Sequence, residues 1–426
     1  MDKNQEDQDL AVNGGTPAVS QPIPPMYPGG MRIGYEEEQA VIDVIRSKRL
    51  FRYYGPNPGP SYVAMLEQEF SAFMHAQYGV AVTSGTAALM CGLIGLGIGP
   101  GDEVIVPAYT WIASASAVVA VGAVPVVAEV DESLTLDPLD VERKITPYTR
   151  AIIPVHMRGA PCQMDALLEV ARKHGLKVLE DTAQANGASF KGARLGSLGD
   201  AGAFSLQFNK IITSGEGGML ITSDAGVHSR VLMYQDVVGG LRNNLPPEEI
   251  LPGINFRMPE LLGAVALVQL RRLDNLLATM RHYKRTIKEG VGDIAQSKGV
   301  QFRRINDPEG DAAVAMVMLM PEAATALRVA DALSAEGVGS GVMFSPDEVD
   351  YHVYYHWAPI MNQRSWTDGG GPWVNHPRKV IYTPDMCPRS LDLLSRAVQL
   401  DINPEMTSEQ VEEVIEAIHK VLKQVT

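Results

Sequence analysis

Hydrophobic and polar positions divide the chain into two parts with different patterns. Between residues 78 and 222, short apolar segments alternate with helical ones, and the strands we predict are 79–82, 103–107, 124–130, 151–155, 177–180, 203–206 and 219–222. Apolar strands with helices between them are typical of a mainly parallel sheet that helices cover on both faces. Ligands of such sheets bind at the carboxyl ends of the strands.

The rest of the chain has a mixed pattern. Apolar positions at helical spacing predict helices over residues 36–48, 61–75, 112–121, 164–174, 323–336 and 408–425, and one long helix over 259–290. Residues 312–320 read as a further strand. We therefore expect an α/β fold with an N-terminal arm (residues 1–30), a large domain (31–265) and a smaller C-terminal α+β domain (266–426).

Composition and charge exclude several classes of protein. The 426 residues include 36 Lys and Arg against 50 Asp and Glu, a formal net charge of −14, which is unfavourable for binding nucleic acid or anionic membranes. No apolar run reaches the ~18 residues of a membrane span, and the polar N-terminus does not resemble a signal peptide. Cys91, Cys162 and Cys387 are too far apart for a disulfide framework or a zinc site. We expect a cytoplasmic enzyme with no metal site.

Three segments place polar residues at the ends of predicted strands. In the first, Ser84, Gly85 and Thr86 follow a strand and open a helix. Free backbone N–H groups and the helix dipole at such a point attract an anion such as phosphate. Because Ser-Gly-Thr also caps many ordinary helices, a simple helix cap stays an open alternative.

The other two segments offer an acid and a lysine. Asp181 directly follows an apolar strand, where it either points into the binding crevice or caps a helix. Lys210 lies between the strand ending near Ser205 and a glycine-dense turn, residues 215–218, which lets the backbone approach a ligand closely. A solvated surface lysine is the alternative interpretation.

Together these residues fit one cofactor. Pyridoxal phosphate requires a lysine for the Schiff base, an acid for the pyridinium nitrogen and a cup for its phosphate. Trp111, just after the strand ending at Pro107, offers a face for the ring. No dinucleotide-binding or P-loop motif competes with this interpretation.

The same strings resemble the DegT/DnrJ/EryC1/StrS family of fold-type-I pyridoxal phosphate enzymes, mostly sugar and cyclitol aminotransferases. The resemblance begins at residue 22 and continues to the C-terminus. It is carried by Ser84–Leu89, Gly101–Pro107, Glu180–Gln184, Gly202–Ser205 with Lys210, Gly215–Gly218 and Asn255–Met258. It implies a large cofactor-binding domain with a seven-stranded, mainly parallel sheet flanked by helices, plus the smaller C-terminal domain.

The resemblance also implies a role for each matching residue. Lys210 would form the Schiff base and move a proton between two carbons, while Asp181 would pair with the pyridinium nitrogen. Gln184 would contact the ring hydroxyl, and Trp111 would stack on the ring. The phosphate would be held by Gly85, Thr86 and Ser205. Asn255 would reach the phosphate of a neighbouring subunit's cofactor, so that a homodimer would be the working unit.

Other residues are candidates for binding substrate. The family usually has an aromatic residue where this chain has Arg158, and an arginine there either binds a carboxylate or phosphate or lies on the surface. Arg257 either meets a substrate carboxylate or forms a structural ion pair. Residues 351–373 are unusually aromatic; His352 and His356 within them either bind sugar hydroxyls or belong to a packed loop cluster.

The resemblance implies an aminotransferase that works by ping-pong transamination through the Lys210 Schiff base. The amino donor would be L-glutamate or L-glutamine, and the acceptor a keto or aldehyde group of a sugar, sugar acid or cyclitol. Two alternatives are a dehydratase of the same family and a non-catalytic sugar-sensing regulator. Dehydratase relatives replace the Schiff-base lysine, usually by histidine, whereas this chain retains Lys210.

Overall fold

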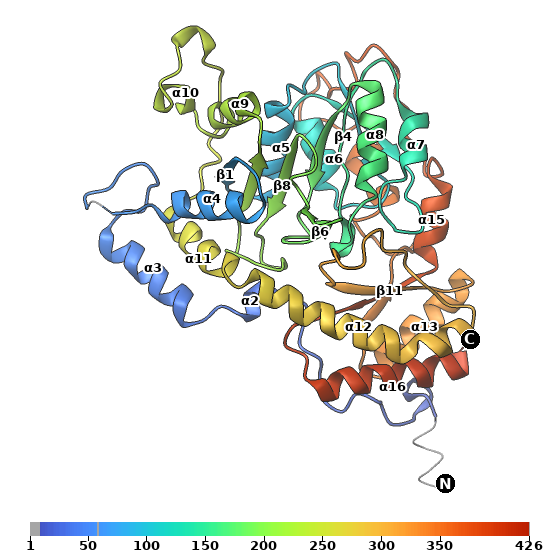
Figure 1. Cartoon of the computed structure of the whole chain (residues 1–426). Coiled ribbons are helices and arrows are strands. Elements are labelled where there is room, and N and C mark those ends of the chain that lie inside the picture. Colours follow the sequence, from blue (N-terminus) through green and yellow to red (C-terminus); the bar gives the residue numbers. More distant parts are fainter. Residues whose placement is uncertain (1–8, 58, 426) are drawn as a thin grey trace.

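The large and the small sheet of the protein lie in separate layers that are bridged by the long helix α12 (Figure 1). The structure is a computed structural model and describes residues 9–57 and 59–425. The first eight residues of the predicted arm therefore lie outside the described residues.

Seven strands form the large sheet, in the order β1-β9-β8-β5-β4-β2-β3. Their bounds are β1 Tyr78–Val82, β2 Glu103–Pro107, β3 Val124–Ala128, β4 Thr149–Ile152, β5 Lys177–Asp181, β8 Ala201–Ser205 and β9 Gly218–Thr222. Neighbours from β8 to β3 pair in parallel, which confirms the predicted α/β class. Strand β9 is antiparallel to both β1 and β8, because no helix separates β8 from β9 and the chain turns straight back.

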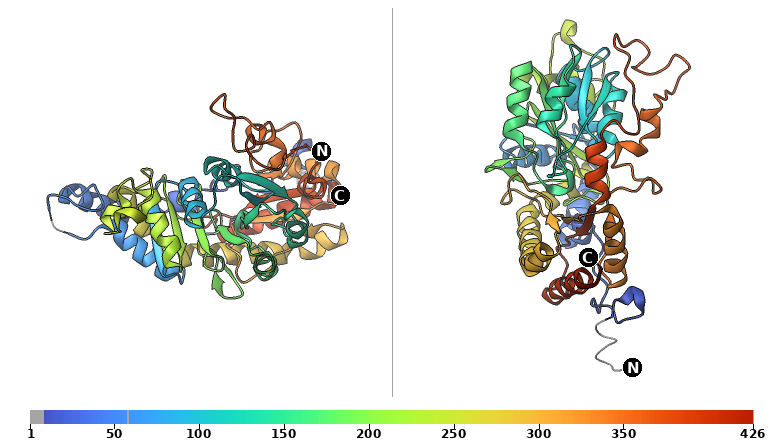
Figure 2. Two further views of the ribbon diagram at one scale, coloured as in Figure 1. Left: turned by 90° about the horizontal axis from the view of Figure 1, so that it is seen from above. Right: turned by 90° about the vertical axis from the view of Figure 1, so that its right-hand side faces the viewer.

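Helices cover both faces of this sheet (Figures 1 and 2). One face carries α5 (Gly85–Gly95), α6 (Ala113–Ala120) and α9 (Ala225–Gln235), whereas the other carries α4 (Tyr62–Phe73), α7 (Pro138–Lys144) and α8 (Met164–His174). Successive strand residues point to opposite faces, so Ala203 packs on the α5 side and Phe204 on the α4 side. All five residues of β8 are buried in consequence.

The small sheet is antiparallel, in the order β10-β11-β13-β12. Its strands are β10 Gln301–Phe302, β11 Ala315–Leu319, β12 Ser340–Val342 and β13 Ala397–Asp401. Three helices pack with it, namely α12 (Leu273–Ser297), α13 (Ala323–Ala335) and α16 (Ser408–Val425) (Figure 1). Apolar residues at helical spacing explain α16, whose Val411, Val414 and Ile418 are buried.

The remaining elements complete the fold. They are η1 Ala11–Asn13, α2 Pro28–Met31, α3 Tyr35–Ser47, η2 Met157–Gly159, β6 Ser189–Phe190, β7 Ala193–Arg194, α10 Gly239–Arg242, η3 Pro247–Glu249, α11 Glu260–Leu270, η4 Tyr354–His356, α14 Ala358–Met361 and α15 Pro388–Ser395.

The single long helix predicted over residues 259–290 is wrong, because two helices, α11 and α12, occupy this stretch. The chain turns at Arg271 and Arg272, where the Arg272 N–H donates to the Gln269 carbonyl, three residues back, at 3.1 Å. The side chains of these arginines form ion pairs in different places, Arg271 with Glu69 and Arg272 with Glu36. The predicted domain boundary at residues 265/266 falls inside α11 and stays a prediction.

The N-terminal arm is tied to the small sheet's helices by one buried acid, Glu336. Its carboxylate accepts the backbone N–H groups of Ala11 and Ala18, both at 2.8 Å, and pairs with Lys420 at 3.0 Å. The arm thereby runs along the small sheet before it reaches the cavity described below.

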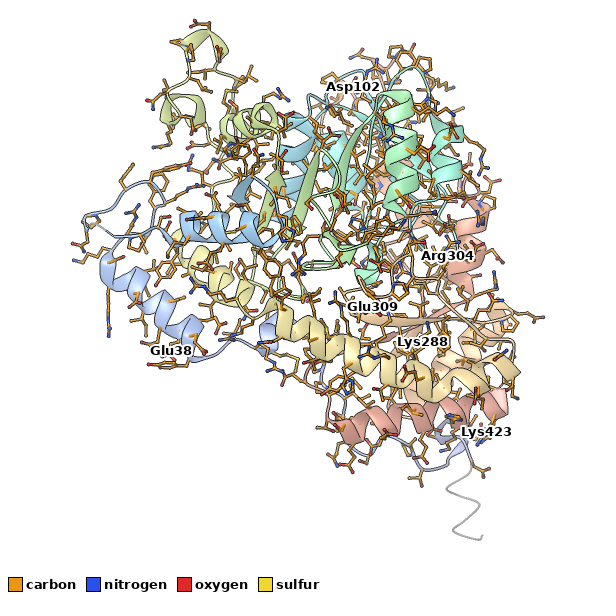
Figure 3. The ribbon with its side chains drawn as sticks, in the orientation of Figure 1. Glu38, Asp102, Lys288, Arg304, Glu309 and Lys423 are labelled. Carbon is orange, nitrogen blue, oxygen red and sulfur yellow. The ribbon has the colours of Figure 1, made fainter. Side chains whose placement is uncertain are left out.

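The large sheet is oriented with the carboxyl ends of its parallel strands toward α12 and the small sheet. Figure 3 shows Asp102, which directly precedes β2, at the end of the sheet remote from α12. Residues that follow these strands therefore face the gap between the two sheets, where ligands of parallel sheets bind.

Candidate active site

A cavity of about 480 Å³ lies at the carboxyl ends of β1, β2, β5 and β8. It brings together many of the residues predicted from sequence: Gly85, Thr86, Trp111, Asp181, Gln184, Ser205, Lys210 and His352. These residues come from segments that are far apart in the chain. The large sheet brings most of these segments to one edge.

The cavity wall at the start of α5 has the form of an anion cradle. Ser84 caps the helix, and its Oγ accepts the Ala87 N–H at 3.0 Å. The helix cap is therefore present. It does not compete with the phosphate role, which stays a prediction, because the first N–H groups of a helix, here those of Gly85 and Thr86, have no partner within the helix. A Cβ on residue 85 would lie 2.8 Å from the Cβ of Ser205, so only glycine lets these two turns approach.

Asp181 is the last residue of β5, and its carboxylate is buried in the cavity wall. Oδ2 accepts the Ser114 hydroxyl at 2.7 Å, and Oδ1 accepts the Ala183 N–H at 3.1 Å. Burial raises the pKa of Asp181, while these two hydrogen bonds oppose the rise. Because Ser114 gives its one proton to Asp181, the neighbouring Thr110 hydroxyl, at 2.7 Å, must donate to Ser114.

Lys210 lies in the turn that follows β8 and is half-buried. Its N–H donates to the Gln207 carbonyl at 2.9 Å, which closes the turn. Burial lowers the pKa of the Lys210 amine, and the nearby negative charge of Asp181 partly offsets this. A lowered pKa increases the fraction of neutral amine, the form that attacks a carbonyl carbon.

Gln184 and Arg158 are linked through the backbone. The Arg158 N–H donates to Gln184 Oε1 at 3.0 Å, which leaves the Gln184 amide nitrogen free to donate toward the cavity. Arg158 has a left-handed backbone, with φ of +51°, and its Nε donates to the Tyr109 hydroxyl at 3.3 Å.

His352 reaches the cavity on a segment that pairs with the residues after β2. The Thr110 N–H donates to the His352 carbonyl at 2.8 Å, and the ring lies 4.9 Å from that of Trp111, centre to centre. Asp350 Oδ1 contacts His352 Nδ1 at 2.7 Å. A carboxylate at Nδ1 favours the proton there, so Nε2 of the neutral ring accepts hydrogen bonds. Burial lowers the His352 pKa and favours that neutral form.

Four predicted residues lie outside the cavity lining: Arg158, described above, and Asn255, Arg257 and His356. Asn255 is exposed, and its Oδ1 accepts the Arg257 N–H at 3.3 Å. Arg257 forms an ion pair with buried Asp236, the structural alternative expected for it. His356 Nε2 contacts the Ser345 carbonyl at 3.0 Å, within the loop itself.

The aromatic stretch 351–373 is only partly packed inside the protein. Tyr354 and Trp357 are fully buried, and Trp373 donates from Nε1 to the Tyr382 hydroxyl at 2.9 Å. Residues 364–369, with Trp366, are instead exposed. The buried part of the stretch forms a packed loop cluster next to His352, which lines the cavity.

The sequence interpretation missed Tyr109, Ser114 and Asp350, which position Arg158, Asp181 and His352. Weak signals for two of them exist. Ser114 is a polar residue in the first turn of a small-residue helix after a strand, and Asp350 precedes His352 by two positions. Nothing local marks Tyr109 as a partner of residue 158.

Comparison with known proteins agrees with this geometry. The model of the DegT/DnrJ/EryC1/StrS aminotransferase family matches residues 31–369. The chain belongs to this family. The expected pyridoxal phosphate-dependent aminotransferase is thereby confirmed as its class.

Individual relatives match over nearly the whole chain. The spore coat polysaccharide biosynthesis protein SpsC of Bacillus subtilis (strain 168) is 33% identical over 92% of this chain and 95% of its own length. An L-glutamine:2-deoxy-scyllo-inosose aminotransferase of Streptoalloteichus tenebrarius is 36% identical over 83% of this chain and 84% of its own. The structure of S. venezuelae DesV in complex with a ketimine intermediate has a TM-score of 0.74, with 32% identity, and covers 92% of this chain and 95% of that one.

The residues of the cavity fit the family's cofactor, pyridoxal phosphate. A glycine-lined helix start suits its phosphate, a buried carboxylate suits its ring nitrogen, and a lysine with a lowered pKa suits its aldehyde. Among the described residues, no group of three or more His, Cys, Asp or Glu side chains could hold a metal ion. No helix in that part of the chain is long and apolar enough to cross a membrane, and the cytoplasmic location stays a prediction.

Proposed function

We propose that this enzyme transfers an amino group from L-glutamate or L-glutamine to a keto or aldehyde group of a sugar, sugar acid or cyclitol. The observation that carries the proposal is the meeting of Lys210 and Asp181 in one cavity with the Gly85 cradle. The names of its relatives, which include an L-glutamine:2-deoxy-scyllo-inosose aminotransferase, support the same class of donor and acceptor.

Bound in this cavity, pyridoxal phosphate would supply an electron sink that stabilises negative charge on the carbon next to the transferred nitrogen. Asp181 would keep a proton on the ring nitrogen, whose positive charge the buried carboxylate stabilises. Gly85, Thr86 and Ser205 would hold the phosphate. Lys210 Nζ would take a proton from the substrate carbon that bears the nitrogen and return it to the carbon on the other side of that nitrogen.

Two further residues complete this proposed arrangement. Gln184 donates from its amide nitrogen to the ring hydroxyl, since its oxygen is already occupied by the Arg158 N–H. Trp111, half-exposed at the mouth of the cavity, covers one face of the ring. His352 supports Trp111 and offers Nε2 to a substrate hydroxyl.

The proposal includes a homodimer in which Asn255 serves the partner's cofactor. Within one chain Asn255 is exposed and lies outside the cavity, so its family role requires a second copy. Leu251 and Ile254, close to it in the chain, are large apolar side chains that are also exposed. Mixing inactive Asn255→Ala and Lys210→Ala chains is expected to restore partial activity, because one site of each mixed dimer then keeps both residues.

Spectroscopy of the purified protein tests the proposal. We expect a visible absorbance band with pyridoxal phosphate, which L-glutamate or L-glutamine converts to the spectrum of the aminated cofactor without any acceptor. The Lys210→Ala variant is expected to lack this band, and its turnover is expected to be lower by at least about 10³-fold. Lys191→Ala, which removes an exposed lysine paired with Asp165, is the matched control. A Lys210→Ala enzyme with normal turnover would overturn the assignment.

A further inference from the structure

A second hollow opens beside the cofactor cavity and shares its central residues. It has a volume of about 350 Å³ and is lined by Lys210, Gln184 and His352 on the cavity side. Tyr27 of the N-terminal arm and Arg158 also line it. The hollow therefore gives a substrate at Lys210 a space that extends to Arg158.

Arg158 brings unused hydrogen-bond donors to this hollow. Of its guanidinium nitrogens, Nε donates to the Tyr109 hydroxyl, and neither Nη group has a described protein partner. Within residues 9–57 and 59–425, no carboxylate lies within 4.0 Å of this side chain. A half-buried cation with two open donors is suited to a planar oxyanion, which accepts both in parallel.

Two acids near Arg158 make their hydrogen bonds elsewhere. Asp350 Oδ1 accepts both the N–H and the Nδ1–H of His352, at 2.9 and 2.7 Å. Asp401 Oδ1 accepts the Gln399 side-chain amide at 2.8 Å. The negative charges of both acids stabilise the charged form of Arg158, but neither acid accepts a hydrogen bond from its Nη groups.

The backbone fixes where the Arg158 side chain starts. Its left-handed conformation is held by the N–H bond to Gln184, and Gly159 follows with φ of +80°. A Cβ on residue 159 would lie 2.9 Å from the Cβ of Ala312, so the chain packs tightly there. These contacts fix the direction in which the Arg158 side chain leaves the backbone, and the Nε bond to the Tyr109 hydroxyl orients its end.

We propose that Arg158 binds a substrate carboxylate through its two Nη groups and makes the enzyme selective for an acidic substrate. This inference rests on the proposed transamination, since it assigns the part of the substrate that lies away from Lys210. The carboxylate belongs either to the amino donor or to a sugar-acid acceptor, and the chemistry at Arg158 is the same for both.

Calorimetric titration of the enzyme loaded with pyridoxal phosphate distinguishes the two sources. Glutarate stands in for the donor, D-glucuronate for an acidic acceptor and D-glucose for an uncharged one. We expect Arg158→Gln to weaken binding of at least one acidic probe by about tenfold or more, and Arg158→Lys to weaken it less. Binding of D-glucose is expected to change little.

The outcomes separate cleanly. If Arg158→Gln weakens the binding of glutarate alone, Arg158 binds the donor. If it weakens the binding of D-glucuronate alone, Arg158 binds the acceptor. If it weakens the binding of both, the site binds each of them in turn. The inference is overturned if Arg158→Gln binds both acids like the wild type, or if the wild type binds neither. Arg150→Gln, an exposed arginine on β4, is the matched control. Failure of the proposed function shows itself separately, as a wild-type enzyme whose absorbance no donor converts.

Discussion

Glu180 and Asp181 are consecutive acids at the end of one strand, yet they face different regions of the protein. Side chains alternate along β5, so Asp181 faces the cofactor cavity while Glu180 faces the core beneath it. Both are buried, and each would cost several kcal/mol if its charge were left without partners.

The two acids differ in how many of their hydrogen-bonding positions are occupied. Glu180 has four partners: the Nε2 atom of His156 at 3.1 Å and the N–H groups of Gly196, Leu198 and Gly199 at 2.7–2.8 Å. Asp181 has two, the Ser114 hydroxyl and the Ala183 N–H. A carboxylate with four partners, three of them backbone N–H groups of one loop, holds that loop in place, whereas one with fewer partners at a cavity wall is available to a ligand.

The largest effect on activity is expected for Asp181→Asn. The amide is nearly the same size, but it carries no charge to hold a proton on the cofactor's ring nitrogen. We expect turnover to fall by about 10³-fold with little change in thermal stability. Steady-state kinetics and a melting curve measure the two effects. Asp165→Asn, at an exposed acid on α8, is the control. Unchanged turnover would exclude Asp181 from the chemistry.

The opposite result is expected for Glu180→Gln. Its amide nitrogen would replace one acceptor oxygen and confront backbone N–H groups that then have no partner. We expect the free energy of unfolding to fall by about 3 kcal/mol, with turnover of the folded enzyme nearly retained. Denaturant unfolding tests this against Glu169→Gln, an exposed position on α8. A stable but inactive Glu180→Gln enzyme would remove the distinction between the two acids.

The residues that the structure brings to the cavity could be singled out in the sequence because their features are local. Asp181 follows an apolar strand, Gly85 opens a helix and Lys210 precedes a glycine-dense turn, so each is marked by its neighbours in the chain. Parallel strands then bring their carboxyl ends to one edge, and the residues meet without any further information.

The remaining contacts join segments with no shared local pattern. The pairing of Thr110 with His352, and the capture of the arm by Glu336, each span more than two hundred residues. Whether Glu180 or Asp181 faces the cavity depends on the pleat of β5, and a cluster of acidic and apolar residues does not fix that register. At the break between α11 and α12, Arg271 and Arg272 likewise pair with acids that are distant in sequence.

Ser114→Ala is the smallest change that tests how Asp181 differs from Glu180. The serine hydroxyl lowers the pKa of Asp181, which burial raises, so its removal lets that pKa rise further. Because the charged carboxylate is the active form, the loss of activity on acidification should begin at a higher pH.

We expect the donor half-reaction of Ser114→Ala to be slower by about tenfold or less near the acid limb and nearly normal at alkaline pH. Stopped-flow absorbance from pH 5 to 9 measures the profile. Ser116 lies on the same helix but makes no hydrogen bond to Asp181, so the pH profile of the control Ser116→Ala should match that of the wild type. A purely structural role for Ser114 would slow the reaction equally at every pH. If the acid limbs of the Ser114→Ala and wild-type profiles have the same shape and midpoint, the charge state of Asp181 does not depend on this hydroxyl.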